Sequence, residues 1–284
     1  MTRHIRLTYA RSWLLVSAAQ PDLHATSRDC AADVVVYDLE DGVIPAHKDH
    51  ARQNLARLLS SEDAHGWVRI NARFTDEWNH DLEALRGLPG LRGIILAKCE
   101  APYEIDATAD RLSRRLPIVA LIESARGIEF AYDIASAGAT ARLAFGSGDF
   151  RRDTGAGADS AALGYARGRL VVASKAAGLP GPIDGPTLTS DDSVLREALD
   201  VTQSMGMTGK LCLTEQHVEH INRELSPTTA DVTWAEDVID RLGPDGGNVT
   251  KGSDLPTLSR ARTIRRLADI FATSRKPASH GNAS

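Results

Sequence analysis

Short apolar runs recur along the chain, and most are followed by polar residues and then by a segment with helical periodicity. Eight runs rich in β-branched or other apolar residues cover 13–18, 33–39, 66–71, 92–98, 117–124, 141–149, 181–186 and 209–214. Helical patterns between them cover 48–59, 76–86, 105–116, 128–137, 161–177 and 191–205. Alternating strand and helix patterns indicate parallel strands, because a parallel return needs a crossover that is usually helical. Eight such units in roughly 200 residues predict a (β/α)8 TIM barrel of the α/β class.

Two more helical patterns follow the eighth strand, at 230–242 and 258–272, and a glycine-rich turn at 243–247 joins them. No regular element should persist through that turn. We therefore expect a catalytic barrel domain over 1–225 and a C-terminal helical extension over 226–273. The polar residues 274–284 should form a disordered tail.

Composition narrows the class of partner. The chain has 284 residues, 42% of them hydrophobic and 25% charged, with a net charge of -5 and a pI near 6.0. This balance offers no basic surface for nucleic acid or for an anionic membrane, so small molecules are the expected partners. The three cysteines form no CxxC pair, which predicts neither a disulfide framework nor a zinc site and favours the cytoplasm. The N-terminus has basic residues before a short apolar run, a pattern that resembles a signal peptide only weakly.

Charged and polar residues close the apolar runs, and in a TIM barrel the active site lies at the C-terminal ends of the strands. These residues are Asp38, Glu40, Asp41, Arg69, Asn71, Lys98, Glu123, Ser124, Asp149, Asp184 and Thr214. Carboxylates gathered in a partly dry mouth raise one another's pKa unless a cation neutralises them. Mg²⁺ binds through one or two carboxylates and leaves positions for substrate oxygens, while Arg69 offers a fork for a carboxylate. The pattern predicts a site for an oxyanionic small molecule on a divalent metal.

Simpler interpretations compete at several of these positions. Asp41 and Asp184 each lie beside a glycine and are more typical of turns than of catalysis. Asp149 could cap a helix, and Lys98 could pair with acidic neighbours as readily as with a substrate. Glu123 is the strongest candidate, because a carboxylate that ends so apolar a strand is seldom buried without a partner.

A dinucleotide-binding domain is a further alternative, because an acidic residue at the end of a second strand is also typical of a Rossmann fold. The first strand is followed by residues 17–22, SAAQPD, which lack the glycine fingerprint. The later GSG at 146–148 has no third glycine and lies far downstream. The barrel therefore remains the preferred interpretation.

Motifs spread in order along nearly the whole chain resemble those of one family. They are RSWLLV at 11–16, ADVVVYDLEDGV at 32–43, VRIN at 68–71, LAK at 96–98, IESARG at 122–127, FGSGD at 145–149, GKLC at 209–212 and SDLP at 253–256. In this set and order they are similar to the citrate lyase β-subunit-like (CitE-like) family of the HpcH/HpaI aldolase superfamily. That family includes malyl-CoA and citramalyl-CoA lyases, and the resemblance implies a (β/α)8 barrel in a homo-oligomer, either trimer or hexamer.

The resemblance also implies roles for individual residues. Glu123 and Asp149 would bind Mg²⁺, and Arg69 would orient the carboxylate and oxo group of a 2-oxoacid. Asp38 and Glu40 would hold metal-bound waters and Arg69 in place.

Other positions would hold the substrate or complete the site. The backbone amides of Ser147, Gly148 and Asp149 would receive a carboxylate, and Lys98 is a further candidate for substrate contact. Asp254, in the C-terminal extension, would reach the barrel of a neighbouring subunit as a general acid or base.

The activity implied is a Mg²⁺-dependent carbon-carbon lyase or aldolase of the retro-aldol or Claisen type. It would act on a 2-oxoacid with an acyl or aldehyde partner, including β-hydroxyacyl-CoA esters such as malyl-CoA or citramalyl-CoA. The chain departs from the family at positions expected to face CoA, namely Ser17, Ser27, Thr214 and Glu215, and the lysine expected near Ser27 is replaced by that serine or by the adjacent Arg28. A thioester hydrolase of malyl-CoA-like substrates, a biosynthetic aldolase that does not use CoA, and a catalytically silent lyase subunit are the alternatives.

Overall fold

The structure, a computed structural model, describes residues 5–61 and 64–274. These residues divide into two compact units. One is Thr8–Asn222, and the other is the segment from Arg223 onward together with the described residues before Thr8. The units are described separately below.

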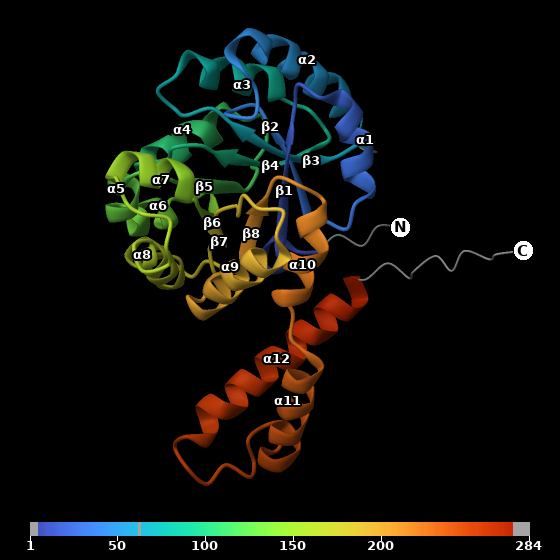
Figure 1. Cartoon of the computed structure of the whole chain (residues 1–284), viewed down its shortest axis with the longest axis vertical. Helices are drawn as coiled ribbons and strands as arrows, with labels where there is room; N and C mark the ends of the chain where they lie inside the picture. Colours follow the sequence, from blue (N-terminus) through green and yellow to red (C-terminus); the bar gives the residue numbers. More distant parts are fainter. Residues whose placement is uncertain (1–4, 62–63, 275–284) are drawn as a thin grey trace, which may run out of the picture. The chain divides into compact units, whose positions relative to one another are not determined.

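Eight parallel strands of the first unit close into a barrel in chain order (Figure 1). They are β1 (Ser12–Ser17), β2 (Val34–Asp38), β3 (Gly66–Ile70), β4 (Leu91–Leu96), β5 (Ile118–Ile122), β6 (Thr140–Phe145), β7 (Ile183–Asp184) and β8 (Gly209–Cys212). The barrel closes where β1 pairs with β8, with Trp13 opposite Leu211. This topology confirms the predicted (β/α)8 fold.

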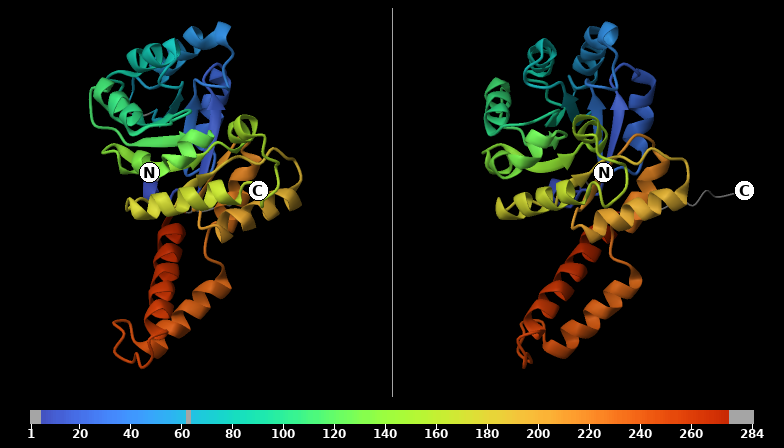
Figure 2. Two further views of the ribbon diagram at one scale, coloured as in Figure 1. Left: turned by 90° about the vertical axis from the view of Figure 1, so that its left-hand side faces the viewer. Right: turned by 60° about the vertical axis from the view of Figure 1, so that its left-hand side comes forward.

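Helices surround the strands and bury their outer faces, as the views in Figure 2 show. They are α1 (Pro21–Asp29), α2 (Lys48–Leu58), α3 (Asp76–Leu85), α4 (Pro102–Arg111), α5 (Ala125–Glu129), α6 (Ala131–Ser136), α7 (Ser147–Thr154), α8 (Gly164–Ala176), α9 (Asp192–Ser204) and α10 (Gln216–Glu224), with short 3-10 turns η1 (Leu7–Tyr9) and η2 (Pro45–His47). Capping side chains mark where several of these helices start. The side chains of Thr75, Ser124 and Asp191 each accept a hydrogen bond from a backbone N–H in the first turn of α3, α5 and α9.

Three boundaries differ from the periodicity prediction. The expected strand 141–149 ends at Phe145, and α7 begins at Ser147, because two glycines there break the strand pattern. The helix expected at 105–116 is α4, which starts earlier, at Pro102, a residue favoured in the first helical turn. The helix expected at 128–137 is two short helices, α5 and α6, separated at Phe130.

A buried arginine occupies the N-terminal end of the barrel. The Arg142 guanidinium donates to Gly181 O at 2.7 Å, Ala10 O at 2.8 Å and Thr208 Oγ1 at 2.7 Å. It also lies 5.8 Å from the ring of Trp13, which meets Trp67 edge to face. Burial lowers the pKa of Arg142 to about 9. Polar atoms that would otherwise face an apolar interior are thereby hydrogen-bonded.

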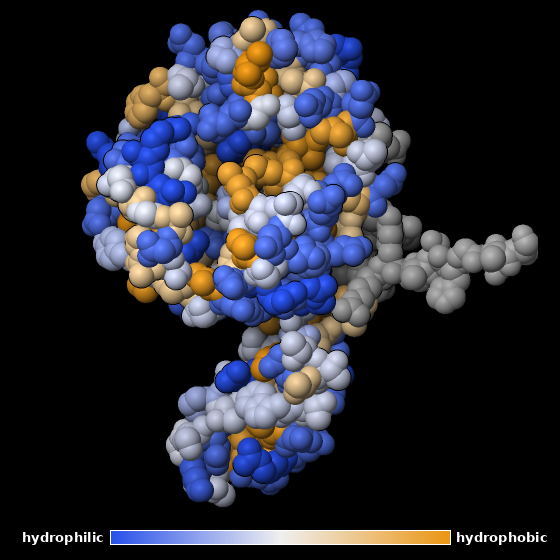
Figure 3. Space-filling view, in the orientation of Figure 1, coloured by the Kyte–Doolittle hydropathy of each residue, from blue (hydrophilic) through white to orange (hydrophobic). Residues whose placement is uncertain are grey.

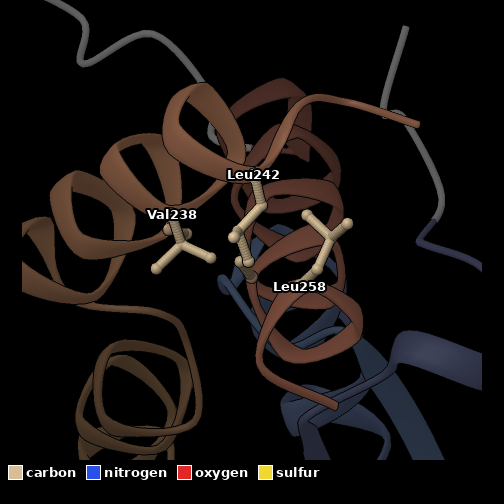
Figure 4. Close-up of a cluster of buried hydrophobic side chains, with 5 residues drawn as sticks. Val238, Leu242 and Leu258 are labelled. Carbon is tan, nitrogen blue, oxygen red and sulfur yellow. The ribbon is translucent and has the colours of Figure 1, made fainter. Parts of the chain in front are cut away.

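The second unit contains α11 (Thr229–Leu242) and α12 (Asp254–Ser274), which pack against each other. A capping box between Thr228 and Asp231 starts α11. Val238, Leu242 and Leu258 form the centre of an apolar cluster that joins the two helices (Figure 4). The tail expected over 274–284 lies outside the described residues, except for Ser274 at the end of α12. None of the described helices has the apolar length that a membrane crossing requires.

Candidate active site

Asp38 ends β2 and organises the turn that follows it. Its two carboxylate oxygens accept hydrogen bonds from Glu40 N at 2.8 Å and Gly42 N at 2.9 Å. A Cβ at residue 42 would collide with the Asp38 carboxylate, so the turn requires glycine there. Asp38 is buried, and its position sets the path of the backbone through Glu40 and Asp41.

Arg69, on β3, pairs with both acidic residues of this loop. Its Nε and Nη2 donate to the two oxygens of Asp38 at 2.8 and 2.5 Å, and its Nη1 lies 3.1 Å from Glu40 Oε2. Burial lowers the pKa of Arg69, but Asp38 and Glu40 raise it by more, so it is raised overall. These contacts use three of the five guanidinium N–H groups, which leaves two for a ligand.

Glu40 is buried between two cations. Besides Arg69, the ammonium of Lys98 pairs with Glu40 Oε1. Burial alone would raise the pKa of Glu40, but Arg69 and Lys98 hold it below its usual value. Asp41, by contrast, keeps most of its side chain exposed, and partial burial of its carboxyl group together with the charge of Glu40 raises its pKa.

Glu123 is the most perturbed carboxyl group in the barrel mouth. It follows β5, is 6% exposed, and accepts a hydrogen bond from Lys98 N at 2.8 Å. Burial, reinforced by the negative charges of Glu40 and Asp149, raises its pKa from 4.5 to about 8. A Cβ at Gly146 would collide with this side chain, so the first glycine after β6 makes room for Glu123.

The first turn of α7 brings Asp149 and three free helix amides to the same mouth. The first intrahelical hydrogen bond runs from Phe150 N to Gly146 O at 3.0 Å. The amides of Ser147, Gly148 and Asp149 precede it and carry the partial positive charge of a helix N-terminus. Asp149 Oδ2 lies 3.3 Å from Lys98 Nζ and 3.0 Å from the exposed side chain of Arg152.

A buried polar network behind the mouth was not anticipated as a unit from the sequence. Lys48 Nζ donates to Leu39 O at 2.7 Å, Glu40 O at 3.1 Å and Asn71 Oδ1 at 2.8 Å. Asn71 in turn donates through Nδ2 to Asp81, a fully buried residue of α3. The network fixes the backbone that carries Glu40. Asn71 was predicted as a strand-end residue, but no local pattern indicated its contacts with Lys48 and Asp81, because the three residues lie on or beside different elements.

Two predicted residues lie elsewhere. Asp184 is the second residue of β7 rather than a turn residue, so the turn interpretation was wrong. It is fully buried, because Arg167 at 3.0 Å, Lys210 at 3.3 Å and the hydroxyl of Thr202 compensate its charge. Asp254 begins α12 in the second unit.

A pocket of about 340 Å³ opens beside Glu40 and Lys98. Its charged lining residues are Glu40, Asp41, Lys48 and Lys98, and its other lining residues include the apolar Val43 and Ile44. In Figure 3, apolar side chains (orange) gather in a hollow of the barrel unit and polar ones surround it. The pocket therefore has a polar side with charges of both signs and an apolar side.

The donor set in the mouth fits a divalent cation. Asp149 Oδ2 is buried and makes no hydrogen bond within the described structure. A positive charge near Glu123 would lower its raised pKa and favour the carboxylate form that binds a metal. Within the described residues, no cluster of three or more His, Cys, Asp or Glu side chains could hold a metal by itself. Two carboxylates completed by water and substrate oxygens suit Mg²⁺, which keeps part of its hydration shell.

The positions that depart from the family's CoA-facing pattern carry no cation. Ser17 Oγ donates to Gly42 O at 2.6 Å, and Ser27 Oγ donates to His24 O at 3.2 Å. Thr214 Oγ1 accepts from Gln216 N in the turn before α10. These side chains serve local backbone structure and offer no fixed positive charge to a phosphate.

Comparison with known proteins places the chain in a family. The HpcH/HpaI aldolase/citrate lyase model matches residues 11–214, and the HpcH/HpaI aldolase C-terminal domain model matches residues 230–272. The chain therefore belongs to the HpcH/HpaI aldolase/citrate lyase family, which confirms the resemblance found in the motifs.

Individual relatives agree with this assignment. A citrate lyase subunit beta-like protein of Mycobacterium tuberculosis is 30% identical over 269 residues, which cover 90% of this chain and 94% of that protein. The mitochondrial citramalyl-CoA lyase of Rattus norvegicus is 30% identical over 83% of this chain and 79% of its own. The crystal structure of M. tuberculosis CitE in complex with magnesium, acetoacetate and coenzyme A superposes with a TM-score of 0.79 at 28% identity and covers 93% of this chain and all of that one.

Proposed function

We propose that this protein is a Mg²⁺-dependent carbon-carbon lyase that cleaves or forms a bond between a 2-oxoacid unit and an acyl unit. The observation that carries the proposal is the arrangement of Arg69, held by Asp38 and Glu40, in the same mouth as Glu123 and Asp149. Glu123 and Asp149 would hold the metal. When bound, Mg²⁺ supplies Lewis-acid polarisation of substrate oxygens.

The protein's own groups account for substrate placement and charge stabilisation. The two unused N–H groups of Arg69 would bind a substrate carboxylate or oxo oxygen, and the amides of Ser147, Gly148 and Asp149 would bind the other carboxylate oxygen. Asp38 and Glu40 keep the guanidinium in a single orientation. Negative charge that develops on the hydroxyl oxygen, as it loses its proton and becomes the oxo group of the 2-oxoacid, would therefore meet donors already in position.

The substrate we favour is a β-hydroxyacyl-CoA of the malyl or citramalyl type. Relatives named L-malyl-CoA/beta-methylmalyl-CoA lyase in Cereibacter sphaeroides and citramalyl-CoA lyase in R. norvegicus support this class. A thioester hydrolase is the second candidate, because the (3S)-malyl-CoA thioesterase of C. sphaeroides is 29% identical over 79% of this chain. Because Ser17 and Ser27 are uncharged, an aldolase that does not use CoA is a third candidate to be tested.

We also infer a homo-oligomer, trimeric or hexameric, in which Asp254 of one subunit completes the barrel of another as general acid or base. Hydrogen bonds from Thr250 N and Lys251 N hold the pKa of Asp254 below its usual value, so it is a carboxylate at neutral pH. The three cysteines, which form no disulfide, support a reducing cytoplasm as the working compartment.

The test is a product assay with purified protein, Mg²⁺ and malyl-CoA or citramalyl-CoA. A lyase releases glyoxylate or pyruvate together with acetyl-CoA, whereas a thioesterase releases free CoA and the intact hydroxy acid. An aldolase that does not use CoA would leave both esters untouched and release pyruvate from a free hydroxy-oxo acid. Absence of every product, with no Mg²⁺ binding, would identify a silent subunit and refute the proposal.

The oligomeric role of Asp254 has its own test. Arg69→Ala and Asp254→Ala variants, each inactive alone, should regain activity when unfolded and refolded together, because about a quarter of the mixed sites would then hold both native residues. A mixture as inactive as its components would contradict an intersubunit site.

A further inference from the structure

Lys98 occupies the space between the acidic groups of the barrel mouth. Its ammonium pairs with Glu40 and lies 3.3 Å from Asp149 Oδ2 and 3.7 Å from Asp41 Oδ1. Three carboxylates, two from the loop after β2 and one from α7, thus share one lysine. Its side chain keeps about a third of its exposed area, so it is not locked in the interior.

The backbone of Lys98 is held in an unusual conformation. Its φ of 50° makes it the one non-glycine residue with positive φ in the described part of the chain. Such conformations are costly for a residue with a Cβ and persist where the surroundings impose them, often at functional sites. Here the conformation directs Lys98 N toward Glu123 Oε1 at 2.8 Å, while the side chain reaches Glu40 and Asp149. One residue therefore contacts both proposed metal ligands.

We propose that Lys98 is a tethered counter-cation that competes with Mg²⁺ for this site. This inference rests on the proposed function, because it takes Glu123 and Asp149 as the metal ligands. An ammonium 3.3 Å from Asp149 Oδ2 and a metal ion bound to the same carboxylate would repel each other strongly in a partly buried mouth. Metal binding must displace the ammonium, so Lys98 neutralises the carboxylates of the metal-free protein and lowers its affinity for Mg²⁺.

The experiment is a titration of metal-free protein with MgCl₂ by calorimetry, combined with thermal unfolding with and without saturating Mg²⁺. Lys98→Met removes the ammonium and keeps most of the side-chain volume. Lys98→Gly removes the ammonium and also suits the positive φ, so it tests the charge without backbone strain. Lys175→Met, in the exposed last turn of α8, is the control for net charge.

Both Lys98 variants should bind Mg²⁺ about tenfold more tightly than the wild type. Without metal, Lys98→Met should unfold at a lower temperature than the wild type, because the carboxylates have lost their counter-cation, and Mg²⁺ should raise its Tm by more. Lys175→Met should match the wild type in both measurements.

Unchanged or weaker Mg²⁺ binding in both Lys98 variants, with a wild type that does bind, would overturn the role of Lys98 and leave the proposed function standing. Failure of wild type and variants alike to bind Mg²⁺ would overturn the proposed function and this inference together.

Discussion

Buried charges are compensated differently at the two ends of the barrel. At the N-terminal end, Arg142 donates to two backbone carbonyls and one hydroxyl. At the C-terminal end, Glu40 pairs with both Arg69 and Lys98, yet Glu123 keeps a raised pKa and Asp149 Oδ2 has no hydrogen bond within the described structure. The charge of Arg142 is matched by hydrogen bonds, whereas the mouth keeps one carboxyl group with a raised pKa and one carboxylate oxygen held only by ion pairs.

This difference shows how a site can be recognised in a barrel without a bound ligand. Buried charge by itself does not indicate function, since Asp184 is fully buried and matched by Arg167 and Lys210. Function is indicated where several charges meet, their pKa values move apart, and hydrogen-bonding capacity remains unused. The predictions below test this distinction.

The largest effect is expected at Arg69. Arg69→Ala should lower kcat/KM for the preferred hydroxyacyl substrate by about 100- to 1000-fold, because such a donor typically contributes ~2.7 to 4 kcal/mol to transition-state stabilisation. Arg69→Lys should recover little of this loss, since it keeps the charge without the planar fork. Steady-state kinetics will measure both, with the exposed Arg57→Ala as control. Turnover of Arg69→Ala within about tenfold of the wild type would refute the assignment.

Arg142 should show the reverse pattern. Arg142→Met should lower the free energy of unfolding by about 2 to 3 kcal/mol, because it leaves buried carbonyls without donors. The kcat of the folded protein should stay close to the wild-type value. Urea unfolding and kinetics on the same preparation will decide. A loss of kcat at unchanged stability would mean that the N-terminal end is not purely structural.

Glu123 should make the stability of the metal-free protein depend on pH. Burial raises the pKa of this carboxyl group from 4.5 to about 8 in the folded state, so between these values the folded protein holds a proton that the unfolded chain has lost. The contribution of Glu123 to stability is therefore greatest at low pH and falls as pH rises through this window.

The difference in unfolding free energy between wild type and Glu123→Gln, measured with a chelator from about pH 5 to pH 8, isolates this effect. The unfolding free energy of the wild type should fall relative to that of Glu123→Gln as pH rises. A difference that is constant across the range would show that Glu123 is ionised throughout and would weaken its contrast with the satisfied charges elsewhere.

The smallest effect is expected at Arg152. Its guanidinium lies 3.0 Å from Asp149 Oδ2, closer than Lys98, but its side chain is 72% exposed and therefore screened by water. Arg152→Ala should change Mg²⁺ affinity by no more than about twofold and stability by less than ~0.5 kcal/mol. A calorimetric change as large as that of Lys98→Met would show that proximity matters more than burial in this mouth.

Much of the fold could be predicted from the sequence because its signals are local. The runs 34–36 and 118–122 are apolar throughout, as is typical of strands buried on both faces. Their order alone leads to a barrel, and the strand-end rule then selects Asp38, Arg69 and Glu123. Element ends were harder to predict, since α4 begins at a proline earlier than expected and the glycines after Phe145 end β6 before its predicted limit.

The residue types at the mouth and the order of the strands were thus determined by the sequence alone. Which of these residues contact one another was decided only by the tertiary structure. Closure of the barrel brings Lys98 to Glu40 and Asp149, places Gly146 where Glu123 needs room, and buries Asp184 against Lys210. These contacts join residues more than twenty positions apart, and their energies depend on burial and distance, which no local pattern records.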